Sequence, residues 1–203
     1  MIITDVEQGS DAWFELRLGK PTASRFKDIY TSTGKNSASA DTYMNMLVAE
    51  VLAGKGLESF SSEWMSRGTE LEPKAREMYE FLTDNEVQQV GFVSNDDATV
   101  GCSPDGLMEI GAKGLEIKCP SPPVHIKYLL AGKCPSEYVP QVQGSMWICE
   151  RDTWDFMSYH PDLPNMILTV ERDEKYIAGL TEAMEVFLEK MAVKLEKLKE
   201  QIA

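Results

Sequence analysis

The spacing of hydrophobic and polar positions changes along this chain, and the change separates predicted helices from predicted strands. Between residues 63 and 82 apolar positions recur every three or four residues, which indicates one face of a helix. The segments 87–94, 98–103 and 114–119 are short and rich in β-branched or aromatic residues, so we predict strands there. The chain ends in a predicted amphipathic helix, whose apolar face is Ile177, Leu180, Met184, Phe187, Leu188, Met191, Leu195 and Leu198.

The intervening segments complete an α/β order. Asp41 or Thr42 is expected to cap a helix that ends at Gly54. Residues 31–41 are rich in Ser, Thr, Gly and Asn, which is typical of a mobile surface loop. Two further helices are predicted at 124–131 and 137–150, and a second pair of strands at 153–159 and 166–172. We therefore expect an α/β fold over residues 1–203, a single domain with one mixed β-sheet flanked by helices.

The composition agrees with a domain of this kind. The chain has 203 residues, of which 43% are hydrophobic and 26% charged, and these values exclude a disordered or fibrous chain. No apolar run approaches the roughly 18 residues that span a bilayer, and the first ten residues lack the basic and apolar regions of a secretion signal. We expect a soluble, unprocessed, cytoplasmic protein without contact with a membrane.

The four cysteines argue against a zinc site and against a disulfide framework. Cys102, Cys119, Cys134 and Cys149 form no CxxC pair, and closely spaced soft ligands are what a zinc site needs. We expect reduced and mostly buried thiols.

The acidic charge balance restricts how this chain could bind nucleic acid. It carries 20 Lys and Arg against 33 Asp and Glu, a formal net charge of −13. A protein that coats DNA through a broad electrostatic surface is usually basic. One segment is locally basic, since residues 17–35 contain Arg17, Lys20, Arg25, Lys27 and Lys35 against Asp28 alone. On charge alone, a solvated face explains this segment better than a binding site.

The strongest chemical signal joins Asp105 of a Ser-Pro-Asp-Gly segment to the strand Leu115-Glu116-Ile117-Lys118. Alternate residues of a strand face the same side, so Glu116 and Lys118 project together while Leu115 and Ile117 face the core. The intervening residues can form a hairpin that places Asp105 at the end of the neighbouring strand. Two carboxylates and an ammonium would then converge.

Such a group suits metal-assisted hydrolysis of a phosphodiester. Carboxylate oxygens bind Mg²⁺, and a second metal ion about 4 Å away can stabilise the leaving oxygen. Beside a metal ion the pKa of Lys118 would be lowered, so that the amine could orient or deprotonate the attacking water. The alternative is a surface cross-strand salt bridge, which is common and contributes little.

Further blocks along the chain point to a family. They are Asp11-Ala12-Trp13, Leu16-Arg17-Leu18-Gly19 with Thr22-Ala23-Ser24, Arg67-Gly68 with Glu70 and Glu72, Cys102-Ser103-Pro104-Asp105-Gly106-Leu107, Leu115-Glu116-Ile117-Lys118-Cys119-Pro120, and Gln141-Val142-Gln143-Gly144-Ser145-Met146-Trp147. In this order and spacing the set closely resembles the lambda-exonuclease (YqaJ-type viral recombinase) branch of the PD-(D/E)xK nuclease superfamily. The resemblance covers almost the whole chain and implies a restriction-endonuclease-like core.

The resemblance implies an activity and an assembly. Members of this family degrade linear double-stranded DNA from the 5′ end, release mononucleotides and leave a 3′ single strand for recombination. They form ring-shaped homotrimers, require Mg²⁺ (with Mn²⁺ as a substitute) and work beside a single-strand annealing protein in a bacterial host cell. A ring needs positive charge only on its inner wall, which would reconcile the basic segment with the acidic chain.

The resemblance also assigns roles to individual residues. Asp105 would bridge two Mg²⁺ ions, Glu116 and the backbone carbonyl of Ile117 would be further ligands, and Lys118 would activate water. Glu72 would serve the second ion, with Glu70 as the less favoured candidate, because Pro73 directly after Glu72 is awkward for a continuous helix. The helix there either starts near Glu72 or is kinked.

Three more roles follow from the resemblance. Gln141 would lie beside the metals and the scissile phosphate. Arg17, Ser24 and Ser103 would hold the 5′-phosphate of the DNA, and a planar guanidinium suits the extra charge of a terminal phosphate.

Other residues have simpler interpretations. Trp13 and Trp147 could stack on bases but are expected in the core. His125 and His160 are expected at the surface or in turns. Two alternative functions remain: an endonuclease or structure-specific nuclease of the same fold, and a non-catalytic DNA-binding recombination partner. The latter is disfavoured because Asp105, Glu116 and Lys118 are all present.

Overall fold

Two β-sheets form the centre of the protein, as the computed structural model shows for residues 1–57, 63–109 and 112–202, with side chains described throughout except at 63–66. The first is antiparallel, in the order β1 (Ile2–Thr4), β2 (Phe92–Ser94) and β3 (Gly101–Cys102). The second has the order β4 (Gly106–Met108), β5 (Lys113–Lys118), β6 (Thr153–Ser158) and β7 (Met166–Glu171). Because β5 and β6 are parallel and the other pairs antiparallel, the predicted mixed sheet is confirmed in β4–β7, while β1–β3 form a separate antiparallel sheet instead of joining it.

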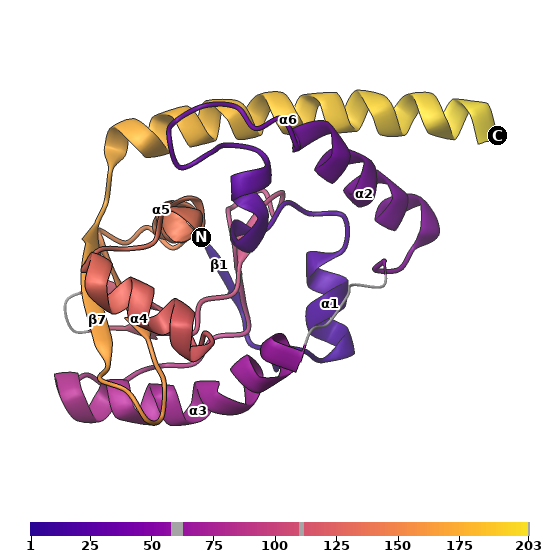
Figure 1. Ribbon diagram of the computed structural model, residues 1–203. Helices are drawn as coiled ribbons and strands as arrows, with labels where there is room; N and C mark the ends of the chain where they lie inside the picture. Colours follow the sequence, from indigo (N-terminus) through magenta and orange to yellow (C-terminus); the bar gives the residue numbers. More distant parts are fainter. Residues whose placement is uncertain (58–62, 110–111, 203) are drawn as a thin grey trace.

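Helices surround these sheets (Figure 1). They are α1 (Asp11–Arg17), α2 (Ala40–Ala53), α3 (Glu63–Thr83), α4 (Pro122–Ala131), α5 (Val139–Ile148) and α6 (Glu174–Ile202), with short 3-10 helices η1 (Ala23–Asp28) and η3 (Ser136–Tyr138). Figure 1 shows α6 along one side of the molecule and α3 along the opposite side, with the strands between them. The predicted α/β fold is confirmed.

The four-stranded sheet is covered on both faces. Leu115, Ile117 and Met157 join Ala75 and Tyr79 of α3 in one hydrophobic cluster. Trp154 and Phe156 belong to a larger cluster that includes residues of α5 and α6. The alternation along 114–119 therefore does not mark a half-buried strand, because the Glu116 face is buried as well.

The terminal helix matches its predicted apolar face. Ile177, Leu180, Met184, Phe187 and Met191 are buried, and the remaining three leucines are packed, half-buried, against the same core. Within the described residues, no helix is both long and apolar enough to cross a membrane.

The helix α3 runs through Pro73, which excludes a helix that starts near Glu72. Its 21 residues carry Glu72 and Pro73 in the interior rather than in a first turn. The buried residues Ala75 and Tyr79 follow and fix the helix against the sheet. Glu72 therefore has a defined position on a packed element.

Two smaller expectations have mixed outcomes. The segment 31–41 is closed by hydrogen bonds, among them Thr31 N–H to the Lys35 carbonyl at 2.8 Å and Ser37 N–H to the Ile29 carbonyl at 2.8 Å, while its mobility stays a prediction. All four cysteines are free thiols; Cys102 and Cys149 are buried, and Cys119 and Cys134 are half-buried.

Candidate active site

The connection between β3 and β4 brings Asp105 to the strand that carries Glu116. Pro104 has no N–H and cannot continue the β3 ladder, so the chain leaves one sheet and enters the other at Ser103–Asp105. Strand β4 then pairs antiparallel with β5, with Gly106 opposite Leu115. The Asp105 N–H donates to the Leu115 carbonyl at 3.2 Å, and Asp105 Oδ2 accepts from the Ile117 N–H at 2.5 Å. The predicted hairpin is present, although residues 110–111 of its turn lie outside the described residues.

Glu116 and Lys118 project to one side of β5, as the period of two predicts. Their carboxylate and ammonium groups form an ion pair. Gln141 of α5 donates from Nε2 to Glu116 Oε1 at 2.7 Å. Tyr138, at the end of η3, places its ring 5.0 Å from Lys118 Nζ. Sequence reasoning missed Tyr138, and no signal in its surroundings along the chain singled it out.

Helix α3 contributes the third carboxylate. Glu72 lines a cavity of about 380 Å³ together with Asp105 and Lys118. Glu70 is exposed and does not line this cavity, so the geometry favours Glu72. The buried Arg76 donates to Glu72 Oε1 at 2.5 Å and from Nε to the Asp105 carbonyl at 3.1 Å. Sequence reasoning missed Arg76, although its spacing of four from Glu72 was a usable signal.

The pKa of Asp105 reflects how close the three carboxylates lie to one another. Burial raises the pKa of Asp105 well above its usual range, and the charges of Glu116 and Glu72 raise it further. Lys118 and the Ile117 N–H act in the opposite direction without cancelling this effect. The same field acts on Cys119, whose thiol pKa is raised to about 11 by burial and then by Glu72 and Asp105.

Lys118 titrates differently from the expectation for a lysine beside a metal ion. Burial lowers the pKa of its ammonium, but the charges of Glu116 and Asp105 outweigh burial and raise the pKa above its ordinary value. The lowering beside a cation stays a prediction, because it depends on the positive charge of the ion.

The donor set fits a hard divalent cation. Glu72, Asp105 and Glu116 offer the carboxylate oxygens that Mg²⁺ prefers, and the mutual repulsion of these carboxylates is what a cation would relieve. Among the described residues, however, no group of three or more His, Cys, Asp or Glu is already arranged to hold an ion. The carboxylate oxygens face Lys118, Arg76 and the Ile117 N–H instead.

A second polar cluster surrounds Arg17, the last residue of α1. Arg17 donates to Ser103 Oγ at 3.1 Å and to Thr22 Oγ1 at 3.3 Å. Thr22 Oγ1 in turn lies 3.4 Å from Ser24 Oγ. Burial lowers the pKa of the Arg17 guanidinium, against smaller opposite effects of Tyr43, Cys102 and Glu50. Arg17, Ser24 and Ser103 therefore come together as predicted, with Thr22 as an addition.

The position of Trp13 differs from the expected core position. Trp13 is half-buried, outside both hydrophobic clusters, with the Arg17 guanidinium 4.1 Å from its ring centroid. Its Nε1–H donates to Ser103 Oγ at 2.9 Å. Trp147, by contrast, packs against the core. Gly19 makes the turn after α1 with φ of +65°, a conformation that favours glycine.

Two adjoining cavities connect the clusters. The cavity at Lys118 shares Thr69, Glu72 and Asp105 with a second cavity of about 620 Å³, which extends to Trp13. The segment between the clusters is held from several sides: Gln8 Nε2 donates to the Pro104 carbonyl at 3.0 Å, and Arg76 to that of Asp105. Ser103 and Asp105 thus sit two residues apart on a fixed connection.

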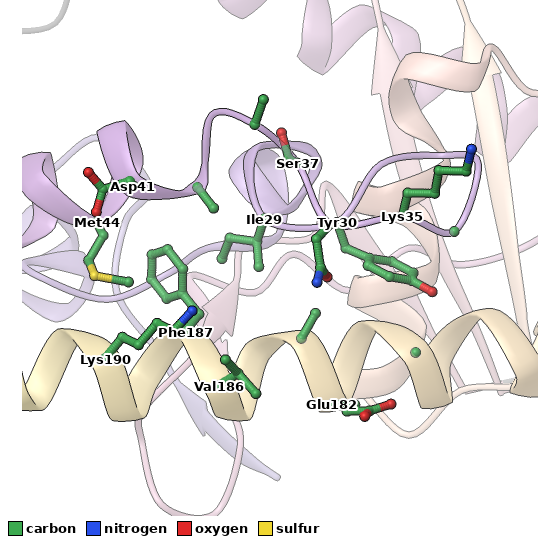
Figure 2. A pocket seen from close by; sticks show the side chains of 16 residues that line it. Ile29, Tyr30, Lys35, Ser37, Asp41, Met44, Glu182, Val186, Phe187 and Lys190 are labelled. Carbon is green, nitrogen blue, oxygen red and sulfur yellow. The ribbon is translucent and has the colours of Figure 1, made fainter.

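The basic segment 17–35 does not form one surface. Lys35 lines a separate cavity of about 710 Å³ between the loop that follows η1, α2 and α6, where Phe187 and Lys190 also lie (Figure 2). Arg25 is paired with Asp28 at 2.5 Å. Arg17 alone among these cations belongs to the hydroxyl cluster around Ser103.

A surface position is wrong for both histidines, because each side chain is buried, whereas His160 does stand at a turn that its carbonyl closes with the Leu163 N–H at 3.3 Å. His125 is fully buried; its Nε2 lies 2.9 Å from the Pro164 carbonyl, and its Nδ1 lies 2.7 Å from Ser158 Oγ. His160 follows β6 and lies 3.2 Å from an Arg67 nitrogen. Ser158, Pro164 and Arg67 are far away in sequence, so the local pattern could not reveal them. Asp162, whose N–H donates to His160 Nδ1 at 3.2 Å, is two residues away.

The comparison with known families settles the relationship that the motif blocks indicated. The family model described as "YqaJ-like viral recombinase domain" matches residues 12–152. The chain belongs to the YqaJ-like viral recombinase family. This family segment contains all the residues of the two clusters described above.

Solved structures resemble this chain over nearly its full length. An alkaline exonuclease (LHK-Exo) from Laribacter hongkongensis matches with a TM-score of 0.87 and 36% identity, over 95% of this chain and 98% of that chain. The same protein in complex with dAMP matches with a TM-score of 0.86, at the same identity and coverage. A phage related exonuclease from Haemophilus somnus 129PT has a TM-score of 0.66 at 15% identity, over 91% of this chain and 96% of that chain, and shares the fold alone.

Proposed function

We propose that this protein is a Mg²⁺-dependent exonuclease that digests one strand of linear double-stranded DNA in the 5′-to-3′ direction. It would release mononucleotides and leave a 3′ single-strand overhang for recombination. The observation that carries the proposal is the adjacency of two clusters on one connection: Ser103 belongs to the Arg17 cluster, and Asp105 belongs to the carboxylate cluster.

The carboxylate cluster is the proposed centre of hydrolysis. Asp105, Glu116, Glu72 and the Ile117 carbonyl would hold two Mg²⁺ ions, with Mn²⁺ as a substitute. Bound there, the ions would polarise the phosphorus centre and lower the pKa of water. Lys118, held by Glu116, would orient the attacking water or accept its proton, and Gln141 would hold Glu116 in place beside the scissile phosphate.

The Arg17 cluster is the proposed binding site for the terminal 5′-phosphate. A guanidinium and the hydroxyls of Ser24 and Ser103 offer hydrogen-bond donors, and a terminal phosphate carries more charge than a diester. Trp13 stacks on Arg17 and so limits its movement. Renewed binding of the new 5′-phosphate after each cleavage would give the digestion a direction.

The relatives support this assignment. One protein that is 36% identical is described as an alkaline exonuclease, and its complex with dAMP shows that a relative binds a mononucleotide. For the assembly we propose a homotrimeric ring around DNA, a single-strand annealing protein as partner, and the cytoplasm of a bacterial host cell as the location.

The test is digestion of a linear duplex that carries a 5′-phosphate on one end only, with Mg²⁺ and with chelator. We expect loss of the phosphorylated strand from its 5′ end, release of mononucleotides, and no reaction in chelator. Arg17→Gln should lower the preference for the phosphorylated end by roughly 10²-fold, which corresponds to about 3 kcal/mol for a charge-assisted contact. Arg25→Gln removes a guanidinium from the same segment and should retain the preference.

The same assay separates the alternatives. Cleavage of closed circular DNA at the same rate would identify an endonuclease and contradict the proposal. Binding of DNA without cleavage in Mg²⁺ or Mn²⁺ would indicate a non-catalytic recombination partner.

A further inference from the structure

The ion pair between Arg76 and Glu72 has a feature that helix geometry alone does not explain. Residues four apart on a helix commonly pair, and such pairs at a surface contribute little. Arg76, however, is buried, and its guanidinium has a second contact outside the helix. Nε donates to the Asp105 carbonyl at 3.1 Å while the terminal nitrogen donates to Glu72 Oε1 at 2.5 Å.

The two contacts join α3 to the connection between the sheets. Glu72 comes from α3 and Asp105 from the junction of β3 and β4, so no hydrogen-bonded strand pairing fixes their separation. A single guanidinium that is hydrogen-bonded to both Glu72 and Asp105 fixes the separation of these two residues directly. A guanidinium presents its donors in a rigid plane, whereas an ammonium acts as a single point of charge, so lysine cannot reproduce this geometry.

Arg76 also offsets the charge that the site concentrates. Glu72, Asp105 and Glu116 are near enough for the first and third to raise the pKa of the second. Without Arg76, the Glu72 side chain would lose its direct ion-pair partner, and repulsion would favour rotamers that turn away from the cavity.

We infer that Arg76 is a positioning residue, which holds the Glu72 carboxylate at a fixed place relative to Asp105 so that both can bind the same pair of divalent cations. This inference rests on the proposed function, since it assigns Arg76 to the metal-binding carboxylates of that function. Arg76 acts through Glu72 and does not contact the substrate.

The test measures ion binding separately from digestion. Mn²⁺ is titrated into DNA-free protein and followed by electron paramagnetic resonance, and the Mg²⁺ concentration for half-maximal digestion is measured in parallel. Residues that orient metal ligands typically change affinity or activity 10–100-fold, so Arg76→Gln should weaken Mn²⁺ binding and raise the Mg²⁺ requirement by roughly that factor. Arg76→Lys should recover only part of the loss, because it keeps the charge without the two-point geometry.

A double variant tests whether the effect passes through Glu72. If Arg76 acts by placing that carboxylate, Glu72→Gln combined with Arg76→Gln should bind Mn²⁺ about as well as Glu72→Gln alone. Losses that multiply in the double variant would overturn the inference, because they would show a separate role for Arg76. Lys74→Gln, which removes an exposed charge from the same helix, is the matched control and should leave Mn²⁺ binding unchanged.

The outcomes distinguish this inference from the proposed function. If the original protein fails to digest DNA with Mg²⁺ or Mn²⁺, the proposed function fails. If it digests DNA and Arg76→Lys and Arg76→Gln keep its Mn²⁺ affinity, only the role of Arg76 fails. Should Arg76→Gln not fold, as judged by circular dichroism, Arg76→Lys decides: unchanged Mn²⁺ affinity overturns the inference, and a weakened one supports it.

Discussion

Asp105 and Glu72 line one cavity with Lys118, which pairs with the buried Glu116, while Arg76 pairs with Glu72. The Asp105 carboxylate accepts a hydrogen bond from the Ile117 N–H. Burial and the two neighbouring carboxylates raise its pKa despite this hydrogen bond. A cation bound at the proposed site would relieve this repulsion and would therefore stabilise the folded protein.

The repulsion among these carboxylates predicts that the stability of the metal-free protein depends on pH. Because the folded-state pKa of Asp105 lies above the unfolded value of 3.8, the folded protein binds more protons, and the contribution of Asp105 to stability falls as pH rises through the range between the two pKa values. Asp105→Asn should therefore raise the melting temperature in chelator at pH 8, by about 2–4 °C for each kcal/mol relieved.

Thermal unfolding with and without Mg²⁺ checks this prediction. Mg²⁺ should raise the melting temperature of the original protein and have little effect on Asp105→Asn. A lower melting temperature of Asp105→Asn in chelator at pH 8 would contradict the proposed repulsion.

At the scale of single residues, the sequence predicted the parts whose signal is local. Asp105 follows from a proline-bounded segment beside a strand, and Glu116 and Lys118 follow from the strand period. The cluster of Arg17, Ser24 and Ser103 depended on family resemblance, because these residues lie up to 86 positions apart. His125 could not be interpreted, since its partners Ser158 and Pro164 are brought to it only by the fold.

Helix α5 and the short helix η1 pack against each other, and each carries a residue of one of the two clusters. Gln141 lies on α5 and Ser24 on η1, and the two elements meet at Gly144, where an added Cβ would collide with the ring of Phe26. Phe26 is fully buried in the core. The glycine is thus required by close packing.

This contact predicts the effect of enlarging Gly144. Gly144→Ala should destabilise the fold by about 1–3 kcal/mol through overpacking, reduced by up to about 1 kcal/mol that alanine gains in a helix. Denaturant unfolding measures the change. Phe26→Leu should lower the free energy of unfolding less in the Gly144→Ala background than in the original protein, because the smaller leucine leaves room for the added methyl group. Strictly additive effects would show that the two residues do not share this contact.

At the scale of elements, periodicity predicted the long segments well and the short ones poorly. The 29-residue α6 repeats its apolar face many times, and the six-residue β5 alternates clearly. Strands β1, β3 and β4 have two or three residues, too few to show a period. The continuation of α3 through Pro73 reflects packing of Ala75 and Tyr79, which outweighs the local cost of proline.

At the scale of the whole molecule, the net charge of −13 would confine the proposed DNA binding to limited regions. Lys20 lies next to the Arg17 cluster and donates to the Leu16 carbonyl at 2.9 Å, Lys27 is exposed on η1, and Lys35 lines another cavity. The proposed ring would turn some of these toward DNA.

Charge reversal identifies which lysines meet phosphates. Lys20→Glu, Lys27→Glu and Lys35→Glu are compared for binding of duplex DNA at several salt concentrations in Ca²⁺, with Lys199→Glu on α6 as control. Replacing a lysine that contacts a phosphate should lower the slope of log K against log salt concentration by about 1. We expect the largest effect at Lys20. Unchanged affinity in all three variants would contradict a localised DNA-binding surface.

The junction of Ser103, Pro104 and Asp105 has a consequence for the size of the product. Two extended residues span at most about 7 Å, and Gln8 and Arg76 hold the backbone of this stretch from either side. If Ser103 binds the terminal 5′-phosphate and Asp105 belongs to the cleavage site, the length of this peptide fixes the distance between the bound phosphate and the bond that is cleaved. The covalent backbone between these two residues would then set the length of each released product, and a hinge motion elsewhere in the protein would not alter it.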